Sequence, residues 1–381
     1  MHNKIKTILI LTSLFGSLGC QIELPSPPPN VLYKYNILRV GSGPADILTA
    51  DLNLDGSVDL VSANTKNNTL SILLGIGDGT FKKTLTFPVS SEPTVVVTGD
   101  VNRDGIPDLL TNSRGSGQLT VLLGYGNGSF RRMPRVLTGR IPLAIIPADF
   151  NNDGNLDVAV TLTFNKMEIF LGSGNGLFKK GKTYPTVSRS LSGVSGDFNN
   201  DGNIDIILAT HSSSSSAIRL FKGNGDGTFL SPISFSKNLS PLTLITKDMN
   251  NNGLQDLVFS SGQGDNMYML ISRGDGTFED EIVFSGGGGP ISLTAGHFNS
   301  DNMTDVAVAN SRSSNFSFIA RRTDGYFYHP TRDYFIDGGT PLAITSGDYN
   351  NDAMTDIAVA SNAKNTIEIY LQRRVFKSTI N

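Results

Sequence analysis

Short apolar and β-branched runs, separated by polar, glycine-rich segments, recur along the chain from residue 44 onward. One class of run is small and nearly uncharged, as expected of strands crowded near a common axis: 44–50, 93–99, 142–148, 190–196, 241–247, 290–296 and 341–347. A second class starts at an aspartate and continues as an apolar run, which predicts strands buried on both faces: 59–63, 108–111, 157–160, 205–209, 256–259, 305–309 and 356–360.

Each unit continues with a third run that alternates apolar and polar positions, as at 69–74, and then with a glycine turn followed by phenylalanine, as at 77–81. Asp-Gly and Asn-Gly favour hairpin turns, and the phenylalanine can fill the gap between neighbouring sheets. A polar fourth strand such as 82–89 follows. Four antiparallel strands in each of seven units predict an all-β, seven-bladed β-propeller. We expect residues 33–40 to complete the last blade, so that no sheet edge stays open.

A nine-residue acidic loop joins the first two strands of every unit. Its first copy, 51–59, has oxygen side chains at positions 1, 3, 5 and 9 and a glycine at position 6. Later copies begin at residues 100, 149, 197, 248, 297 and 348. Calcium takes six to eight oxygen ligands and prefers this spacing, whereas an EF-hand needs a glutamate at position 12, where Ser62 stands. A sodium ion, or Asx turns without a metal, is the alternative.

The predicted calcium ligands are the side chains at positions 1, 3, 5 and 9 and the carbonyl at position 7: Asp51, Asn53, Asp55, Ser57, Asp59; Asp100, Asn102, Asp104, Ile106, Asp108; Asp149, Asn151, Asp153, Asn155, Asp157; Asp197, Asn199, Asp201, Asn203, Asp205; Asp248, Asn250, Asn252, Leu254, Asp256; Asn299, Asp301, Asp305; Asp348, Asn350, Asp352, Met354 and Asp356. Bound calcium would stabilise the fold.

The seven loops are unequal. The first four keep three carboxylates each, whereas Asn252 replaces an acid in loop five. In loop six His297, interpreted as a substituted ligand, stands at position 1, and Asn302 replaces the glycine. In loop seven Ala353 stands at the glycine position, at a cost of about 1 kcal/mol if its φ is positive. We therefore expect about five to seven calcium ions, with the loops at 248 and 297 the weakest.

The repeat can be compared with a known family. Asp51-Leu-Asn-Leu-Asp-Gly-Ser-Val-Asp-Leu, followed by Leu73-Leu-Gly-Ile-Gly-Asp-Gly-Thr-Phe81, resembles the FG-GAP or VCBS repeat. That repeat is the unit of calcium-binding propellers related to the headpiece of integrin α subunits. The resemblance covers essentially the whole chain after Asn30. It implies the fold and the metal more than the task, because such repeats occur in adhesins, lectins, lyases and toxin components.

The N-terminal segment indicates export. Lys4 and Lys6 precede a mostly apolar stretch too short to span a membrane, so residues 1–19 are interpreted as a signal peptide. Cys20, the only cysteine, follows a segment that resembles a bacterial lipobox, which implies acylation at Cys20 and anchoring to the outer membrane or cell surface. An ordinary signal peptide and a soluble secreted protein are the alternative. Residues 20–30, rich in proline, predict a tether, and 31–381 the propeller.

The chain carries little that indicates catalysis. We find no nucleophile elbow, zinc-protease motif or phosphate loop, and therefore expect no enzyme. A net charge of −3 argues against nucleic-acid binding. We expect a monomeric binding or adhesion module that holds a protein or glycan on the rim opposite the acidic loops or in the central funnel. A polysaccharide lyase is the alternative. Arg321 and Arg322 are expected to lie solvated on outer strands.

Overall fold

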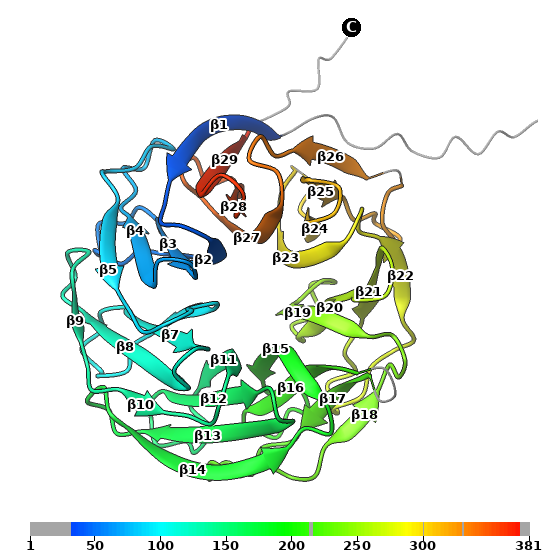
Figure 1. Ribbon diagram of the computed structural model, residues 1–381. Coiled ribbons are helices and arrows are strands. Elements are labelled where there is room, and N and C mark those ends of the chain that lie inside the picture. The colour runs from blue at the N-terminus through cyan, green and yellow to red at the C-terminus, as the bar shows by residue number, and fades with distance from the viewer. Residues whose placement is uncertain (1–31, 213–215, 300, 330, 374–381) are drawn as a thin grey trace, which may run out of the picture.

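The structure, a computed structural model, describes residues 32–212, 216–299, 301–329 and 331–373. Seven antiparallel sheets stand around a central axis like the blades of a propeller (Figure 1). The first three blades are β2 (Pro44–Ala50), β3 (Asp59–Asn64), β4 (Thr69–Leu73) and β5 (Leu85–Pro88); β6 (Val96–Gly99), β7 (Asp108–Ser113) and β8 (Gln118–Gly124) with β9 (Phe130–Arg132) and β10 (Val136–Leu137); and β11 (Pro142–Ala148), β12 (Asp157–Leu162), β13 (Lys166–Gly172) and β14 (Phe178–Pro185).

Blades four to six repeat this order, and the strands of blade seven come from both ends of the described chain. They are β15 (Arg189–Gly196), β16 (Asp205–His211), β17 (Ala217–Phe221) and β18 (Ile233–Phe235); β19 (Pro241–Lys247), β20 (Asp256–Ser261), β21 (Asn266–Leu270) and β22 (Ile282–Ser285); β23 (Pro290–Gly296), β24 (Asp305–Asn310), β25 (Asn315–Ile319) and β26 (Arg332–Phe335); and β27 (Pro341–Gly347), β28 (Asp356–Ser361) and β29 (Thr366–Gln372) with β1 (Leu32–Arg39).

The predicted ring closure is confirmed. β1 pairs antiparallel with β29, from Leu32 opposite Gln372 to Arg39 opposite Thr366. Figure 1 shows β1 along the outside of the last blade, beside β29. One sheet therefore contains strands from both ends of the described chain, which leaves no blade incomplete.

The inner strand of blade two is shorter than predicted. It begins at Val96 instead of residue 93. The cause is Asn112 on the neighbouring strand β7, whose side-chain oxygen accepts the N–H groups of both Thr94 and Val95 at 2.9 Å. Amide hydrogens held by a side chain do not enter the sheet ladder, so the strand starts later.

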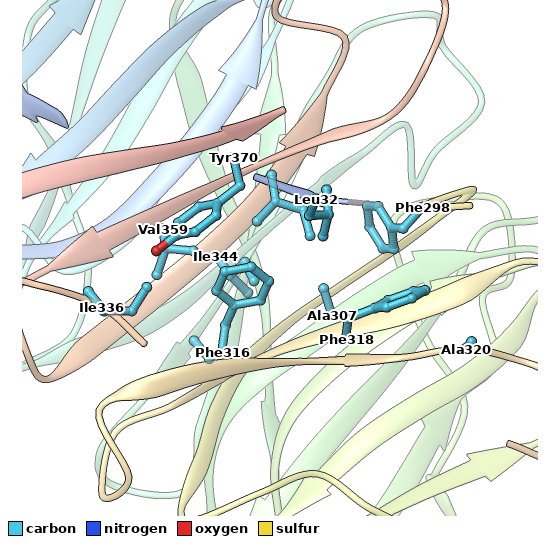
Figure 2. Packing of buried hydrophobic residues seen from close by; sticks show 12 residues of the cluster. Leu32, Phe298, Ala307, Phe316, Phe318, Ala320, Ile336, Ile344, Val359 and Tyr370 are labelled. Atoms are coloured by element: carbon cyan, nitrogen blue, oxygen red, sulfur yellow. The ribbon is translucent and has the colours of Figure 1, made fainter. Parts of the chain in front are cut away.

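The apolar core lies between the blades. Each of seven buried clusters joins the facing sides of two neighbouring blades. Figure 2 shows the cluster between blades six and seven, where Phe316 and Phe318 of β25 pack with Val359 and Tyr370 of blade seven. Leu32 of β1 lies in the same cluster, so the closing strand also buries apolar surface. Stability is therefore distributed over seven interfaces.

The predicted signal peptide, tether and Cys20 lie outside the described residues. None of the elements described here is a helix that is long and apolar enough to cross a membrane.

Candidate functional site

All seven acidic loops lie on one rim, because each joins an inner strand to the second strand of its blade. In loop one, Asp51 accepts N–H bonds from Asp55 at 3.2 Å and Gly56 at 2.9 Å. Asn53 also accepts the N–H of Asp55, and Asp55 accepts that of Ser57 at 3.0 Å. These bonds fold the loop tightly around its carboxylates and fix the side chains at positions 1, 3 and 5.

The position-9 acid ties the loop to the rest of its blade. Asp59 is fully buried, and its two oxygens accept the N–H groups of Leu52 and Gly75, each at 2.8 Å. A position-9 acid accepts an N–H from the end of the third strand in every other blade as well: Asp108, Asp157, Asp205, Asp256, Asp305 and Asp356. This second role explains why an acid stands at position 9 in all seven copies.

The electrostatics of the loops suit a cation. Burial raises the pKa of Asp59 to about 6, and the nearby charges of Asp55 and Asp51 raise it further. Burial likewise raises the pKa of Asp356 to about 7. Within the described residues, no three acidic, histidine or cysteine side chains converge into a preassembled ion site. The hard oxygen donors fit calcium chemically, and calcium at these loops stays a prediction.

Loops six and seven depart from the pattern in different ways. Nδ1 of His297 lies 3.1 Å from the carbonyl oxygen of Met303, the position-7 oxygen that would face the ion. Asn302 and Ala353 hold positive φ angles of 61° and 64° at the position where loop one has Gly56 at 83°. The expected strain at Ala353 is therefore present, whereas Asn302 tolerates this conformation.

Glycine turns couple four of the acidic loops to the next blade. In loops two, three, four and seven the position-2 carbonyl accepts the N–H of the second turn glycine of that next blade, for example Phe150 from Gly227 at 2.9 Å. The turn phenylalanine packs on the same residue, with the rings of Phe229 and Phe150 5.4 Å apart and near perpendicular. The predicted filling of the gap between sheets by phenylalanine is confirmed. A change in one of these four loops would therefore also alter a blade interface.

The opposite rim carries the hairpins between second and third strands and the links between blades; we call it the hairpin rim. On blade three, Phe164 in the β12–β13 hairpin is 63% exposed, and Val187 in the link to blade four is 56% exposed. The two segments touch, because Thr186 N–H donates to Asn165 O at 3.0 Å. Val187 also has a φ of 65°, an outlier for a β-branched residue. Strained, exposed apolar residues of this kind concentrate at functional sites.

A family model described as an FG-GAP-like repeat matches residues 51–111, 112–160, 149–208, 197–259, 248–308 and 297–359. The chain belongs to this family. Five of the six matches begin at the first position of an acidic loop, and each of these five runs through the next loop along the chain.

Solved structures of low sequence identity share the fold. A crystal structure of BBS1N in complex with ARL6DN, soaked with lead, matches with a TM-score of 0.64 and 12% identity over 91% of this chain and 98% of that chain. A mercury-soaked crystal of the same complex gives 0.62 and 11% over the same shares. Raptor from Chaetomium thermophilum gives 0.58 and 14% over 91% of this chain and 29% of its own. No curated protein sequence matches significantly.

Sequence reasoning missed position 4 of the FG-GAP-like loops. This residue takes the left-handed conformation in all six loops where the structure describes it: Leu54, Arg103, Asn152, Asn200, Asn251 and Asn351. Position 4 of loop six lies outside the described residues. Asn152 donates from its side chain to Asn203 of loop four at 3.1 Å, and Asn351 to Ser57 of loop one at 3.3 Å. The recurrent asparagine was the available signal, because asparagine tolerates this conformation.

The prediction that Arg321 lies solvated on an outer strand is wrong. The residue is only 4% exposed. Its guanidinium donates to the carbonyl oxygen of Met249 in loop five. Burial lowers the pKa of Arg321, and the charges of Asp256, Asp248 and Asp305 oppose that shift. A fixed cation therefore stands beside loops five and six, the two whose acidic patterns are weakest.

Proposed function

We propose that this FG-GAP-like propeller is a non-catalytic, calcium-stabilised binding or adhesion module for a protein or glycan. We further propose that it is exported and held at the cell surface through an acylated Cys20. The observation that carries the binding role is the exposed apolar pair Phe164 and Val187 on the hairpin rim. Exposed apolar groups on the loops of a rigid scaffold are typical of recognition surfaces.

Two further points support a binding role. The strained φ of Val187 is maintained by its surroundings at a free-energy cost of about 1–3 kcal/mol, which is typical of contact sites. In addition, the BBS1N propeller, which shares this fold, was crystallised in complex with a second protein, ARL6DN. A propeller of this kind can therefore serve as a protein-binding scaffold.

The calcium part of the proposal rests on loops one to four and seven. Their side chains at positions 1, 3 and 5 would hold the ion together with the position-7 carbonyl. Bound calcium would supply positive charge beside a carboxyl whose pKa is raised mainly by burial and further by the charges of Asp55 and Asp51. Loops five and six have Arg321 nearby instead.

The binding proposal is tested by probing glycan and extracellular-protein arrays in calcium with the wild type, Phe164→Ser and Leu177→Ser. Leu177 is a matched control, because it is 43% exposed on the same blade but on the acidic-loop rim. We expect Phe164→Ser to lose binding and Leu177→Ser to keep it. Equal binding by all three proteins would place the ligand elsewhere. Release of unsaturated oligosaccharides from a bound polysaccharide would favour the lyase alternative.

Anchoring has its own test. Cells expressing the full chain or Cys20→Ser are labelled with a fatty-acid analogue and extracted with a phase-separating detergent. We expect the wild type to carry label and enter the detergent phase, and Cys20→Ser to do neither. A wild-type protein without label, found in the medium, would support a soluble secreted protein instead.

A further inference from the structure

A cavity of about 390 Å³ lies on the propeller axis. Its walls come from the inner-strand regions of all seven blades, close to where these strands begin. The beginnings of the inner strands face the hairpin rim, so the cavity belongs to that end of the channel. Its volume falls in the range of small-ligand sites, about 300–1,000 Å³.

The cavity wall is asymmetric. Four partly exposed aliphatic side chains from blades four to seven line one side and form an apolar collar: Leu191, Leu242, Ile291 and Leu342. The opposite side, from blades one and two, carries smaller side chains next to Asp46. Asp46 is the only titratable residue among those that line the cavity. One charge thus faces an otherwise apolar and hydroxyl-bearing wall.

The structural role of Asp46 does not need a charge. Its Oδ2 accepts the N–H of Val96 on the next blade at 2.9 Å, close to a register shift in β2. Serine hydroxyls make the same inter-blade bond at matched positions elsewhere in the ring: Ser192 accepts the N–H of Leu244 at 3.1 Å, and Ser292 that of Ile344 at 3.3 Å. A hydroxyl is therefore sufficient for the bond, and the carboxylate adds a negative charge to the cavity.

No cation among the residues that the structure describes pairs with this charge. Burial raises the pKa of Asp46 to about 7, and the N–H groups of Val96 and Ile47 offset only part of that rise. An ionised carboxylate in such surroundings costs free energy unless a counter-charge arrives. A ligand that brings a cation would recover that cost.

We propose that this cavity binds an aliphatic ammonium or guanidinium group, whose charge pairs with Asp46 and whose methylene stem packs against the apolar collar. The chemistry is that of a free alkylamine or of a lysine or arginine side chain reaching in from a partner. The site does not involve Phe164, so this inference and the proposed rim function can fail separately.

The test is calorimetric titration at a pH of about 8, where most of the Asp46 carboxyl is ionised. The probes are n-butylamine, its neutral analogue n-butanol, and N-acetyl-lysine amide. We expect at least one of the two cations to bind saturably and about tenfold or more tighter than butanol. Binding of butylamine alone indicates a free-amine site, and binding of the lysine amide indicates a side-chain site.

Two variants make the test specific. Asp46→Ser keeps an inter-blade acceptor of the type found at Ser192 and Ser292, so the fold is retained; it should weaken cation binding about tenfold, a change of about 1.4 kcal/mol. Asp280→Ser removes an exposed acid on the outside of the ring and should leave binding unchanged. The inference is overturned if neither cation saturates, if butanol binds as tightly, or if Asp46→Ser binds like the wild type.

Discussion

Lys34 closes the ring through charge as well as through strand pairing. From β1, its Nζ reaches Oε2 of Glu368 on β29 at 2.7 Å and Oδ2 of Asp337 at 2.8 Å. The Glu368 side chain has no exposed surface, and that of Lys34 is 28% exposed. Glu368 also accepts bonds from the Tyr370 hydroxyl at 3.0 Å and the Gly338 N–H at 3.1 Å. Replacing Lys34 by methionine would therefore leave a buried carboxylate with two neutral donors and without its nearest cation.

The size of the effect follows from burial. Removing one partner of a buried ion pair costs about 3–5 kcal/mol. Because two neutral donors remain and the lysine is partly exposed, we expect Lys34→Met to lower the free energy of unfolding by about 3 kcal/mol. Blade three provides a matched control, in which Lys180 pairs with Glu168 at 2.6 Å but is 49% exposed. Solvent screens the lysine end of that pair, whereas the Glu168 side chain is only 7% exposed, so Lys180→Met should cost less than Lys34→Met, about 1–2 kcal/mol.

Urea unfolding measures both losses, and limited proteolysis reports whether β1 leaves the last blade. We expect Lys34→Met to be cleaved next to β1 faster than the wild type, and Lys180→Met to be cleaved at the wild-type rate. The double variant Lys34→Met/Glu368→Gln should recover part of the stability, because the buried charge is gone. Equal losses in the two single variants, or no recovery in the double variant, would refute the role of charge in closure.

Four further predictions concern the acidic loops. Chelation should lower the melting temperature, since each site at ten times its dissociation constant adds about 1.4 kcal/mol. In the chelated protein the pKa of Asp59 is raised to about 6, so between a pH of about 4 and 6 the folded state binds more protons than the unfolded state. The melting temperature in thermal scans should therefore fall as pH rises through this window. Added calcium should abolish the fall. Ala353→Gly should stabilise by about 1 kcal/mol, and Gly56→Ala, whose new Cβ would meet nothing within 4 Å, should destabilise by a similar amount in urea unfolding. Arg321→Met should cost about 1–3 kcal/mol in calcium and in chelator alike, because the buried carbonyl of Met249 loses its donor; a loss seen only with chelator would contradict the interpretation of Arg321 as a built-in cation.

Most of the fold could be predicted because recurrent loop and turn motifs mark the ends of the strands in each repeat. The acidic loop marks the passage from the first strand to the second, and the glycine turn marks the passage from the third to the fourth, so strand order follows from the period. Closure of the ring by β1 could also be predicted, because residues 33–40 resemble a fourth strand and the seventh unit lacks one. The late start of β6 could not be predicted, since it depends on the side chain of Asn112 from another strand.

The candidate site was only partly predictable, because individual blades compensate for their own departures. The residue that donates its N–H to the position-9 acid is glycine in blades one to four, where a Cβ would press on a backbone carbonyl: Gly75, Gly124, Gly172 and Gly223.

Blades five to seven have Ser272, Arg321 and Gln372 at this position, and the same three blades have lost an acid or the glycine of their loop. Loss of the glycine donor and loss of an acid or glycine from the loop therefore occur in the same blades. The sequence of a loop shows only which acid or glycine it has lost. It does not show that Arg321, some 70 residues after loop five, brings a positive charge to that loop. We therefore expect the stabilisation by calcium to be concentrated in blades one to four and seven, with blades five and six held largely by the protein itself.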